Sequence, residues 1–305
     1  MTLGQLKVFV LVARLGSVRA AAAALDVSEP AVSQALAALR NHLGDPLISR
    51  AGSTMELTAA GQRVVGLASQ IVNLASEAEE VVRRSNGAPD LLRVVTTSTL
   101  AHAVVPSLLE AFGSRQLSVE ATLGTADTHE MEALVSERLT DVALGPRLGG
   151  ELDSEPIMRY RLTALRAASG HDSETWLVDP TVADSMSDAS RVLQRLGVPE
   201  HRVRVFPNQA AACAAAAAGE GTVLAVEHLA VSQIQRGVLV PVPLPGLPFD
   251  ALWYVTTLAP DRRTVAATRF RRFLSTPDAM HAMHRADGGV PASRFKPPVY
   301  VTIWS

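Results

Sequence analysis

Apolar and polar positions in the first part of the chain follow the period of successive helices. Apolar side chains recur three and four residues apart from Leu3 to Ala13, which predicts a helix with one buried face. Gly16 is suited to end that helix and Ser17 to cap a second, shorter one. Asp26 lies where the chain must turn, and Asp tolerates the left-handed backbone conformation that a tight turn needs. The pattern therefore predicts two helices followed by a tight turn.

A third helix is predicted to begin after Ser28 and to run to about Leu43. Ser28 is a favourable N-cap, and Pro30 falls in the first turn, where its missing N–H breaks no helical hydrogen bond. Apolar residues at helical spacing give this helix a buried face, and Gly44 is suited to end it. Two short helices joined by the turn at Asp26 predict a helix-turn-helix.

The segment that follows is predicted to form a small hairpin and then a long helix. Residues 47–57 have apolar ends around small residues, which is typical of a hairpin, or wing. Thr58 is suited to cap the helix, which is predicted to end near Asn86. From Val64 to Val82 its apolar residues alternate three and four apart, like the seam of a coiled coil. Such a seam needs a cover, and we predict a second copy of the chain; packing against its own domain is the alternative.

In the rest of the chain the pattern changes to apolar strands that alternate with helices in two successive sets. The first set runs from Leu92 to Leu144 and the second from Trp176 to Val242. Such alternation is typical of βαβ sheets, and two α/β halves imply a cleft between them. A late apolar run at 253–258 and the helix after it are predicted to return the chain to the first half.

The sequence thus predicts an α/β protein with an N-terminal all-α winged helix-turn-helix. We expect the winged helix-turn-helix domain at 1–58, a linker helix at 59–88, two α/β halves at 91–288 and a tail at 289–305. The length of 305 residues agrees with more than one domain.

Composition narrows the location and the chemistry. No apolar run reaches the roughly 18 residues that a membrane span requires, and the N-terminus does not resemble a secretory signal, so we expect a cytoplasmic protein. Cys213 is the single cysteine, so neither an intrachain disulfide nor a cysteine-built zinc site can form. His281 and His284 have no third ligand nearby, and there is no phosphate loop or nucleophile elbow. The sequence therefore indicates no metal, no cofactor and no catalytic residues.

Two stretches carry a resemblance to a known family. Residues 25–50, LDVSEPAVSQALAALRNHLGDPLISR, and residues 57–61, LTAAG, resemble the N-terminal domain of LysR-type transcriptional regulators. Weaker similarity covers most of the remaining chain. The resemblance implies a dimerising linker helix and an effector domain of two α/β subdomains like periplasmic binding proteins, often assembled as a tetramer. It also implies a sequence-specific DNA-binding regulator of transcription, controlled by a small-molecule effector between the two halves.

The resemblance further implies which side chains contact DNA. The helix that opens at Ser28 would enter the major groove of a pseudo-palindromic operator, bound by a homodimer or a homotetramer. Gln34 is long enough to pair with adenine, Pro30 can contact a thymine methyl group, and Arg50 is suited to phosphate. The expected DNA-contacting residues lie in the first turns of this helix and in the wing: Ser28, Glu29, Pro30, Ser33, Gln34 and Arg50.

Departures from the family pattern alter the charge of this reading surface. Glu29 stands where Gln is usual, Ala37 where Lys or Arg is common, and Arg40 where Glu is common. Residues 1–58 carry five Lys and Arg against four Asp and Glu, a net charge of +1, which is weakly basic for a DNA-binding module. Glu29 either accepts a hydrogen bond from cytosine N4 or stabilises the N-terminus of its helix.

Hydroxyl side chains gather at the positions where the family holds its effector, near strand ends and the first turns of the following helices. Unpaired N–H groups there suit an anion, and Arg147 could pair with a carboxylate, so an anionic effector is one hypothesis. Ser, Thr and Asn at helix starts also serve as caps, which is the alternative role. The expected effector-binding residues are Thr97, Ser98, Thr99, Thr125, Arg147, Asn208 and Gln209.

Two other classes of function are alternatives. One is a metabolic enzyme or a stand-alone binding protein whose α/β domain carries a helical extension. The other is an architectural DNA-binding protein without a ligand, against which the low charge of residues 1–58 argues. Specific binding to one promoter distinguishes a regulator from an enzyme, and a ligand-dependent thermal shift distinguishes a sensor from an architectural protein.

Overall fold

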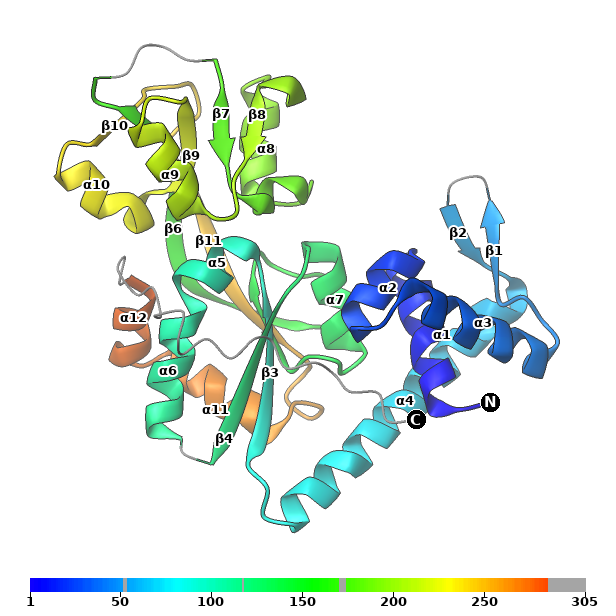
Figure 1. Cartoon of the computed structure of the whole chain (residues 1–305). Coiled ribbons are helices and arrows are strands. Elements are labelled where there is room, and N and C mark those ends of the chain that lie inside the picture. The colour runs from blue at the N-terminus through cyan, green and yellow to red at the C-terminus, as the bar shows by residue number, and fades with distance from the viewer. Residues whose placement is uncertain (52–53, 117, 170–173, 285–305) are drawn as a thin grey trace.

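The computed structural model describes residues 1–284 apart from 52–53, 117 and 170–173, and apart from the side chains of a few further residues (Figure 1). The N-terminal part holds three helices and a hairpin, which are α1 Leu3–Leu15, α2 Val18–Leu25, α3 Glu29–Leu43, β1 Ile48–Ala51 and β2 Thr54–Leu57. The predicted helix-turn-helix and the hairpin after it are therefore confirmed.

Local side-chain chemistry sets the ends of these helices. Ser17 Oγ accepts the N–H of Ala20 at the start of α2, and Ser28 Oγ accepts the N–H of Ala31 at the start of α3. Asp26, at a φ of 53°, makes the left-handed turn between α2 and α3. These caps and the turn lie where the sequence predicts them.

A long helix, α4 Ala59–Ser85, leads from this part toward the sheet (Figure 1). One face of α4 packs against α1, and its Ala68 and Val72 are buried in the core of the N-terminal part. The opposite face is exposed at Leu67, Ile71, Leu74, Val81 and Val82. The predicted seam is therefore an apolar row that the described part of the single chain leaves open to solvent.

The start of α4 lies tightly against the chain that enters the hairpin. A Cβ atom on Gly61 would lie 2.0 Å from the carbonyl oxygen of Leu47. Thr58 Oγ1 accepts the N–H of Gly61 at 2.9 Å and donates to Asp45 Oδ1 at 2.9 Å. Because only glycine permits this approach, residue 61 fixes the angle at which α4 begins.

The remainder of the chain is built on one sheet with the strand order β4-β3-β5-β11-β6-β9-β7-β8, and β10 also pairs with β6. The first half has parallel strands β3 Asp90–Thr96, β4 Val119–Thr125 and β5 Val142–Gly145, with helices α5 Ser98–Ala103, α6 Val105–Arg115 and α7 Thr128–Ser136. The second half has strands β7 Trp176–Val178, β8 Val203–Val205, β9 Thr222–Val226 and β10 Leu239–Pro241, with helices η1 Pro180–Ala183, α8 Asp188–Arg195, η2 Glu200–Arg202, α9 Gln209–Ala217, η3 Glu227–Ala230 and α10 Val231–Gln235. The two predicted α/β halves are thus present.

Two long antiparallel strands run through both halves, β6 Asp153–Ala167 and β11 Phe249–Thr257. β11 also pairs with β5, and β6 also pairs with β9, so these strands join the halves without a break. The helices α11 Val265–Leu274 and α12 Pro277–His284 complete the first half, which confirms the predicted return of the chain.

Strand β6 was not predicted, although charged and apolar side chains alternate along part of it, as is typical of a strand with one buried face. Arg159 and Arg161 face outward, whereas Met158, Tyr160 and Leu162 are buried. The expected tail at 289–305 lies outside the described residues. None of the helices in the described part combines the length and the apolarity needed to span a bilayer.

Candidate functional site

The first turns of α3 carry polar side chains, and α3 lies in the N-terminal part, apart from the sheet (Figure 1). All five of the residues expected there are exposed: Ser28, Glu29, Pro30, Ser33 and Gln34. The Ser28 hydroxyl also caps the helix, and Glu29 lies in its first turn, where a carboxylate stabilises the helix N-terminus. The residues expected to contact DNA therefore lie together on one accessible helix face.

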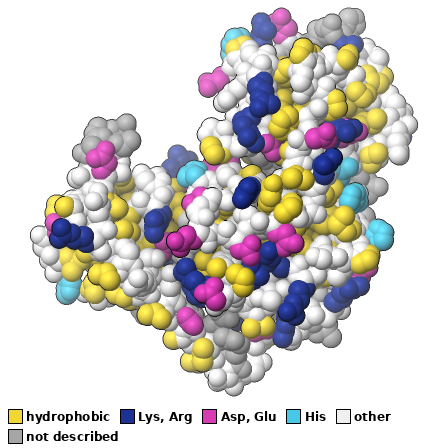
Figure 2. All heavy atoms as spheres, turned by 180° about the vertical axis from the view of Figure 1, so that it is seen from behind, with side chains coloured by type: hydrophobic (Ala, Val, Ile, Leu, Met, Phe, Trp, Pro, Cys, Tyr) yellow, Lys and Arg dark blue, Asp and Glu magenta, His cyan; other side chains and the backbone are white. Residues whose placement is uncertain are grey.

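The side chain of Arg40 makes a structural contact within the N-terminal part. Its Nη2 donates to the carbonyl oxygen of Ile48 at 3.5 Å, which ties α3 to the hairpin, and its Nε is buried. Arg50 lies on β1 opposite Met55, and its side chain lies outside the described residues. Lys and Arg side chains on the N-terminal part lie apart from one another on the face shown in Figure 2.

A cleft lies between the two α/β halves, and hydrogen bonds cross it. Thr99 Oγ1, in α5, donates to Asp179 Oδ2 at 2.5 Å and lies 2.9 Å from Thr181 Oγ1. Thr128, the first residue of α7, donates its backbone N–H to Asp184 Oδ2 at 2.9 Å, and its hydroxyl donates to the same oxygen. Carboxylates of the second half thus sit at the starts of two helices of the first half, where an anion would otherwise be favoured.

Two cavities open in this cleft, and they share Thr97 and Thr181. The larger has a volume of about 390 Å³ and the smaller about 40 Å³. Their lining includes five carboxylates and no Lys or Arg among the described residues; the carboxylates are Asp127, Glu130, Asp179, Asp184 and Asp188. The cleft therefore has an acidic lining.

Five of the expected effector-binding residues are brought together here. Thr97, Thr99 and Gln209 line the smaller cavity, and Thr97, Ser98 and Thr125 line the larger one. Thr97 is 8% exposed, and its hydroxyl has no hydrogen-bond partner among the described residues. This hydroxyl is available to a bound molecule, whereas that of Thr99 is bonded across the cleft.

The other two residues, Asn208 and Arg147, line neither cavity, and Gln209 is held by hydrogen bonds on the lining of the smaller one. Asn208 Oδ1 accepts the N–H of Ala211 and caps α9, and Asn208 lines neither cavity. Gln209 is buried, and its amide is bonded to both the N–H and the carbonyl oxygen of Val226, which ties α9 to β9. Arg147 is exposed and lines neither cavity, so the cation that favoured an anionic effector is not in the cleft.

Asp179, Thr181 and Asp184 were not expected from the sequence. They follow strand β7 of the second half, as Thr97 and Thr99 follow strand β3 of the first. The same rule, that side chains after a strand end face the cleft, would have found them.

Helix α7 connects this cleft to the N-terminal part. Its first residue is bonded across the cleft, and Glu137, directly after its last residue, is only 2% exposed. Glu137 Oε1 accepts from Arg14 Nε of α1 at 3.0 Å, and Glu137 Oε2 accepts from the Ser69 hydroxyl of α4. Ala133 of α7 packs into the core of the N-terminal part, and α7 lies between the sheet and α1 (Figure 1).

Other reactive side chains are placed without a role in either site. Cys213 is buried in α9, and burial together with the charge of Asp179 raises the pKa of its thiol to about 12. The thiol is therefore protonated and unreactive at neutral pH, as a small core residue would be. In the described part of the chain, no cluster of three or more His, Cys, Asp or Glu side chains could hold a metal ion.

A helix-turn-helix with an exposed third helix, joined by a long helix to two α/β halves around a cleft, is the architecture of a class of DNA-binding transcription regulators. Residues 3–62 match the model of the bacterial regulatory helix-turn-helix protein, lysR family, and residues 85–276 match that of the LysR substrate binding domain. The chain belongs to the LysR family of transcription regulators, which confirms the resemblance and a regulator rather than an enzyme.

Relatives match over the whole length of the chain. The uncharacterized HTH-type transcriptional regulator Rv0377 of Mycobacterium tuberculosis is 34% identical over 323 residues, which cover 100% of both chains. The regulator CfxR of Cupriavidus necator is 26% identical and covers 96% of this chain and 97% of its own. Full-length LysG of Corynebacterium glutamicum with bound effector Arg is 21% identical, with a TM-score of 0.55 and coverage of 92% and 99%. The likeness to LysG supports the fold.

Proposed function

We propose that the affinity of this regulator for a pseudo-palindromic operator changes when a small molecule binds in the cleft. We further propose that α7 transmits the conformational change to the DNA-binding part. The double attachment of α7 carries this proposal. Its first residue, Thr128, is bonded to Asp184 across the cleft, and Glu137 at its other end is bonded to α1 and α4. A ligand that displaces Asp184 moves one end of a rigid nine-residue helix whose other end holds the DNA-binding part.

The acidic lining favours a positively charged effector over the anion considered from the sequence. An anion would enter beside several carboxylates with no Lys or Arg on the described lining to offset the repulsion. A cation meets the opposite field, and Tyr160 and Trp253, which stack at 4.5 Å, offer it aromatic surface in the smaller cavity. The Thr97 hydroxyl adds a hydrogen-bond partner.

Thermal unfolding of the full-length protein with small charged probes tests this proposal. Arginine and putrescine should stabilise the protein by about 2.7 kcal/mol at a hundredfold excess over Kd, and succinate at equal ionic strength should not. Stronger stabilisation by succinate would contradict the charge of the effector but leave the cleft as the sensor. Stabilisation that survives both Thr97→Val and Asp184→Asn would place the ligand outside the cleft and contradict the proposed function.

Glu137→Gln should leave ligand binding intact and weaken the effect of the ligand on DNA binding. The amide cannot hold Arg14 as a carboxylate does, so we expect ligand stabilisation to persist while the ligand-dependent change in operator affinity falls at least fivefold. Fluorescence anisotropy with an operator recovered by genome-wide fragment selection measures the response. His129→Gln, an exposed change on the same helix, is the control and should retain it. An unchanged response in Glu137→Gln would rule out transmission through this contact.

Glu29→Gln tests how the reading helix meets DNA. We expect the selected binding motif to stay the same and the affinity to rise up to about tenfold, because a carboxylate beside the phosphates is removed. Gln34→Ala is the positive control and should cost about 1–3 kcal/mol of base discrimination. A new preferred base at one position per half-site would instead show that Glu29 reads cytosine.

A further inference from the structure

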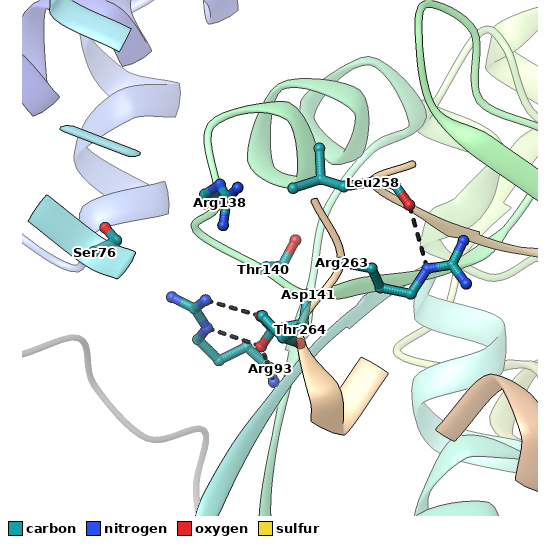
Figure 3. A pocket seen from close by; sticks show the side chains of 8 residues that line it. All are labelled: Ser76, Arg93, Arg138, Thr140, Asp141, Leu258, Arg263 and Thr264. Atoms are coloured by element: carbon teal, nitrogen blue, oxygen red, sulfur yellow. Dashed lines mark hydrogen bonds and ion pairs between the residues drawn. The ribbon is translucent and has the colours of Figure 1, made fainter. Parts of the chain in front are cut away.

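A small cavity outside the cleft lies where α4 meets the sheet, and its walls come from four separate parts of the chain. Figure 3 shows Ser76 of α4, Arg93 of β3, and Arg138, Thr140 and Asp141 from the segment between α7 and β5. Leu258, Arg263 and Thr264 complete it from the segment before α11. The side chains of Ser76, Arg93 and Arg138 face the same space between α4 and the sheet (Figure 3).

Two buried hydrogen-bond donors face this cavity without an acceptor. Arg138 Nε and Thr140 Oγ1 are both inaccessible to solvent and have no hydrogen-bond partner. An unpaired buried polar group typically costs about 1–3 kcal/mol, and more when it is charged. Arg138 also has a φ of 55°, a backbone conformation that non-glycine residues rarely adopt. The site therefore lacks an acceptor that would serve both groups.

The charge balance of the cavity is positive. Its lining holds three Arg side chains and one carboxylate, and that carboxylate, Asp141, is already bonded twice by the Arg93 guanidinium, at 2.9 and 3.0 Å. Arg263 is neutralised outside the cavity by Asp153. Arg138 has no ion pair among the described residues.

We propose that this cavity binds one small inorganic anion of about the size of chloride. Its volume of about 20 Å³ is just above what one water molecule needs and is too small for a larger organic acid. A water molecule could accept hydrogen bonds from Arg138 and Thr140, but it would leave the positive charge uncompensated. An anion accepts the same hydrogen bonds and also compensates the charge. The Ser76 hydroxyl lies on the same lining and can donate as a further ligand.

The position of the site gives the anion a structural effect. Ser76 belongs to the helix that carries the DNA-binding part, and Arg93, Arg138 and Thr140 belong to the α/β part. A bound anion therefore stabilises the attachment of α4 to the sheet, independently of any molecule in the cleft.

Thermal unfolding of the full-length protein in chloride tests the proposal, with sodium gluconate replacing sodium chloride at constant ionic strength. Chloride should raise the melting temperature along a saturating curve. Arg138→Gln should raise the half-saturating concentration at least tenfold, and Thr140→Val, which removes only the hydroxyl donor, should raise it severalfold. Arg115→Gln, at an exposed pair with Asp278, should behave as the parent protein does.

Diffraction from crystals soaked in bromide gives the direct readout. An anomalous peak within hydrogen-bond distance of Arg138 Nε and Thr140 Oγ1 is expected. A melting temperature that is the same in chloride and gluconate, or a chloride effect that Arg138→Gln and Thr140→Val both retain, would overturn the proposal. So would a cavity that holds only water after the bromide soak.

Discussion

Replacing both Leu67 and Leu74 with Glu should leave the full-length protein monomeric at micromolar concentration and lower its operator affinity by about three orders of magnitude. The two leucines are 61% and 66% exposed, in the apolar row along α4. Burying each of them against a second copy contributes about 1.5–3 kcal/mol, and two-fold symmetry counts each contact twice. Loss of the second reading helix removes a further factor of about 10²–10⁴ in avidity. Analytical ultracentrifugation and fluorescence anisotropy measure the two effects.

Gln62→Glu is the control for this variant. It adds one negative charge, against the two of the leucine variant, at an exposed position of α4 away from the apolar row, so it should leave association unchanged. A double leucine variant that still sediments as a dimer would show that another surface joins the copies.

Gly61→Ala should lower the free energy of unfolding of the N-terminal part by about 3 kcal/mol. The added methyl group would stand 2.0 Å from the Leu47 carbonyl oxygen, which is backbone and cannot rotate away. Either α4 or the chain entering the hairpin must shift, and the hydrogen bond from Gly61 N–H to Thr58 is lost in the process. Urea unfolding followed by circular dichroism measures the loss as an earlier first transition.

Gly66→Ala gives the comparison. It lies one and a half turns further along α4, and a Cβ there meets nothing within 4 Å. Alanine is the better helix former, so this variant should be more stable by about 0.5–1 kcal/mol. Equal effects of the two substitutions would mean that the contact at Leu47 does not constrain α4.

The parts of the fold that depend on residues close together in the sequence could be predicted from the sequence. The caps at Ser17 and Ser28 and the turn at Asp26 act within a few residues, and their hydrogen bonds form where the residue types indicate. The apolar row of α4 was equally plain, because helical spacing alone defines it. β6 was missed although its charged and apolar residues alternate as in a strand, whereas its pairing with β9, β10 and β11 depends on tertiary packing that sequence spacing does not show.

The chemistry of the cleft could be predicted only in part. Thr97 and Thr99 were found because they follow a strand, but Asp179 bonds Thr99 across 80 positions of sequence, and Asp184 bonds Thr128 across 56. The hydrogen bonds of Gln209 to Val226, and the position of Arg147 outside the lining of both cavities, also depend on tertiary packing. Side-chain type therefore indicated where the site lies. The charge of the cleft lining could be recognised only after the two halves were placed together in the structure.

The continuous strands β6 and β11 have a mechanical consequence for the cleft. Domains joined by flexible loops rotate freely against each other. Here any opening of the cleft must bend two paired strands, so the sheet resists large rotations of one half against the other. The register of the pair shifts between Trp253 and Tyr254, and we expect the two strands to bend most easily at this point. Ligand binding should therefore produce a small elastic rotation about this bulge, one that reverses when the ligand leaves.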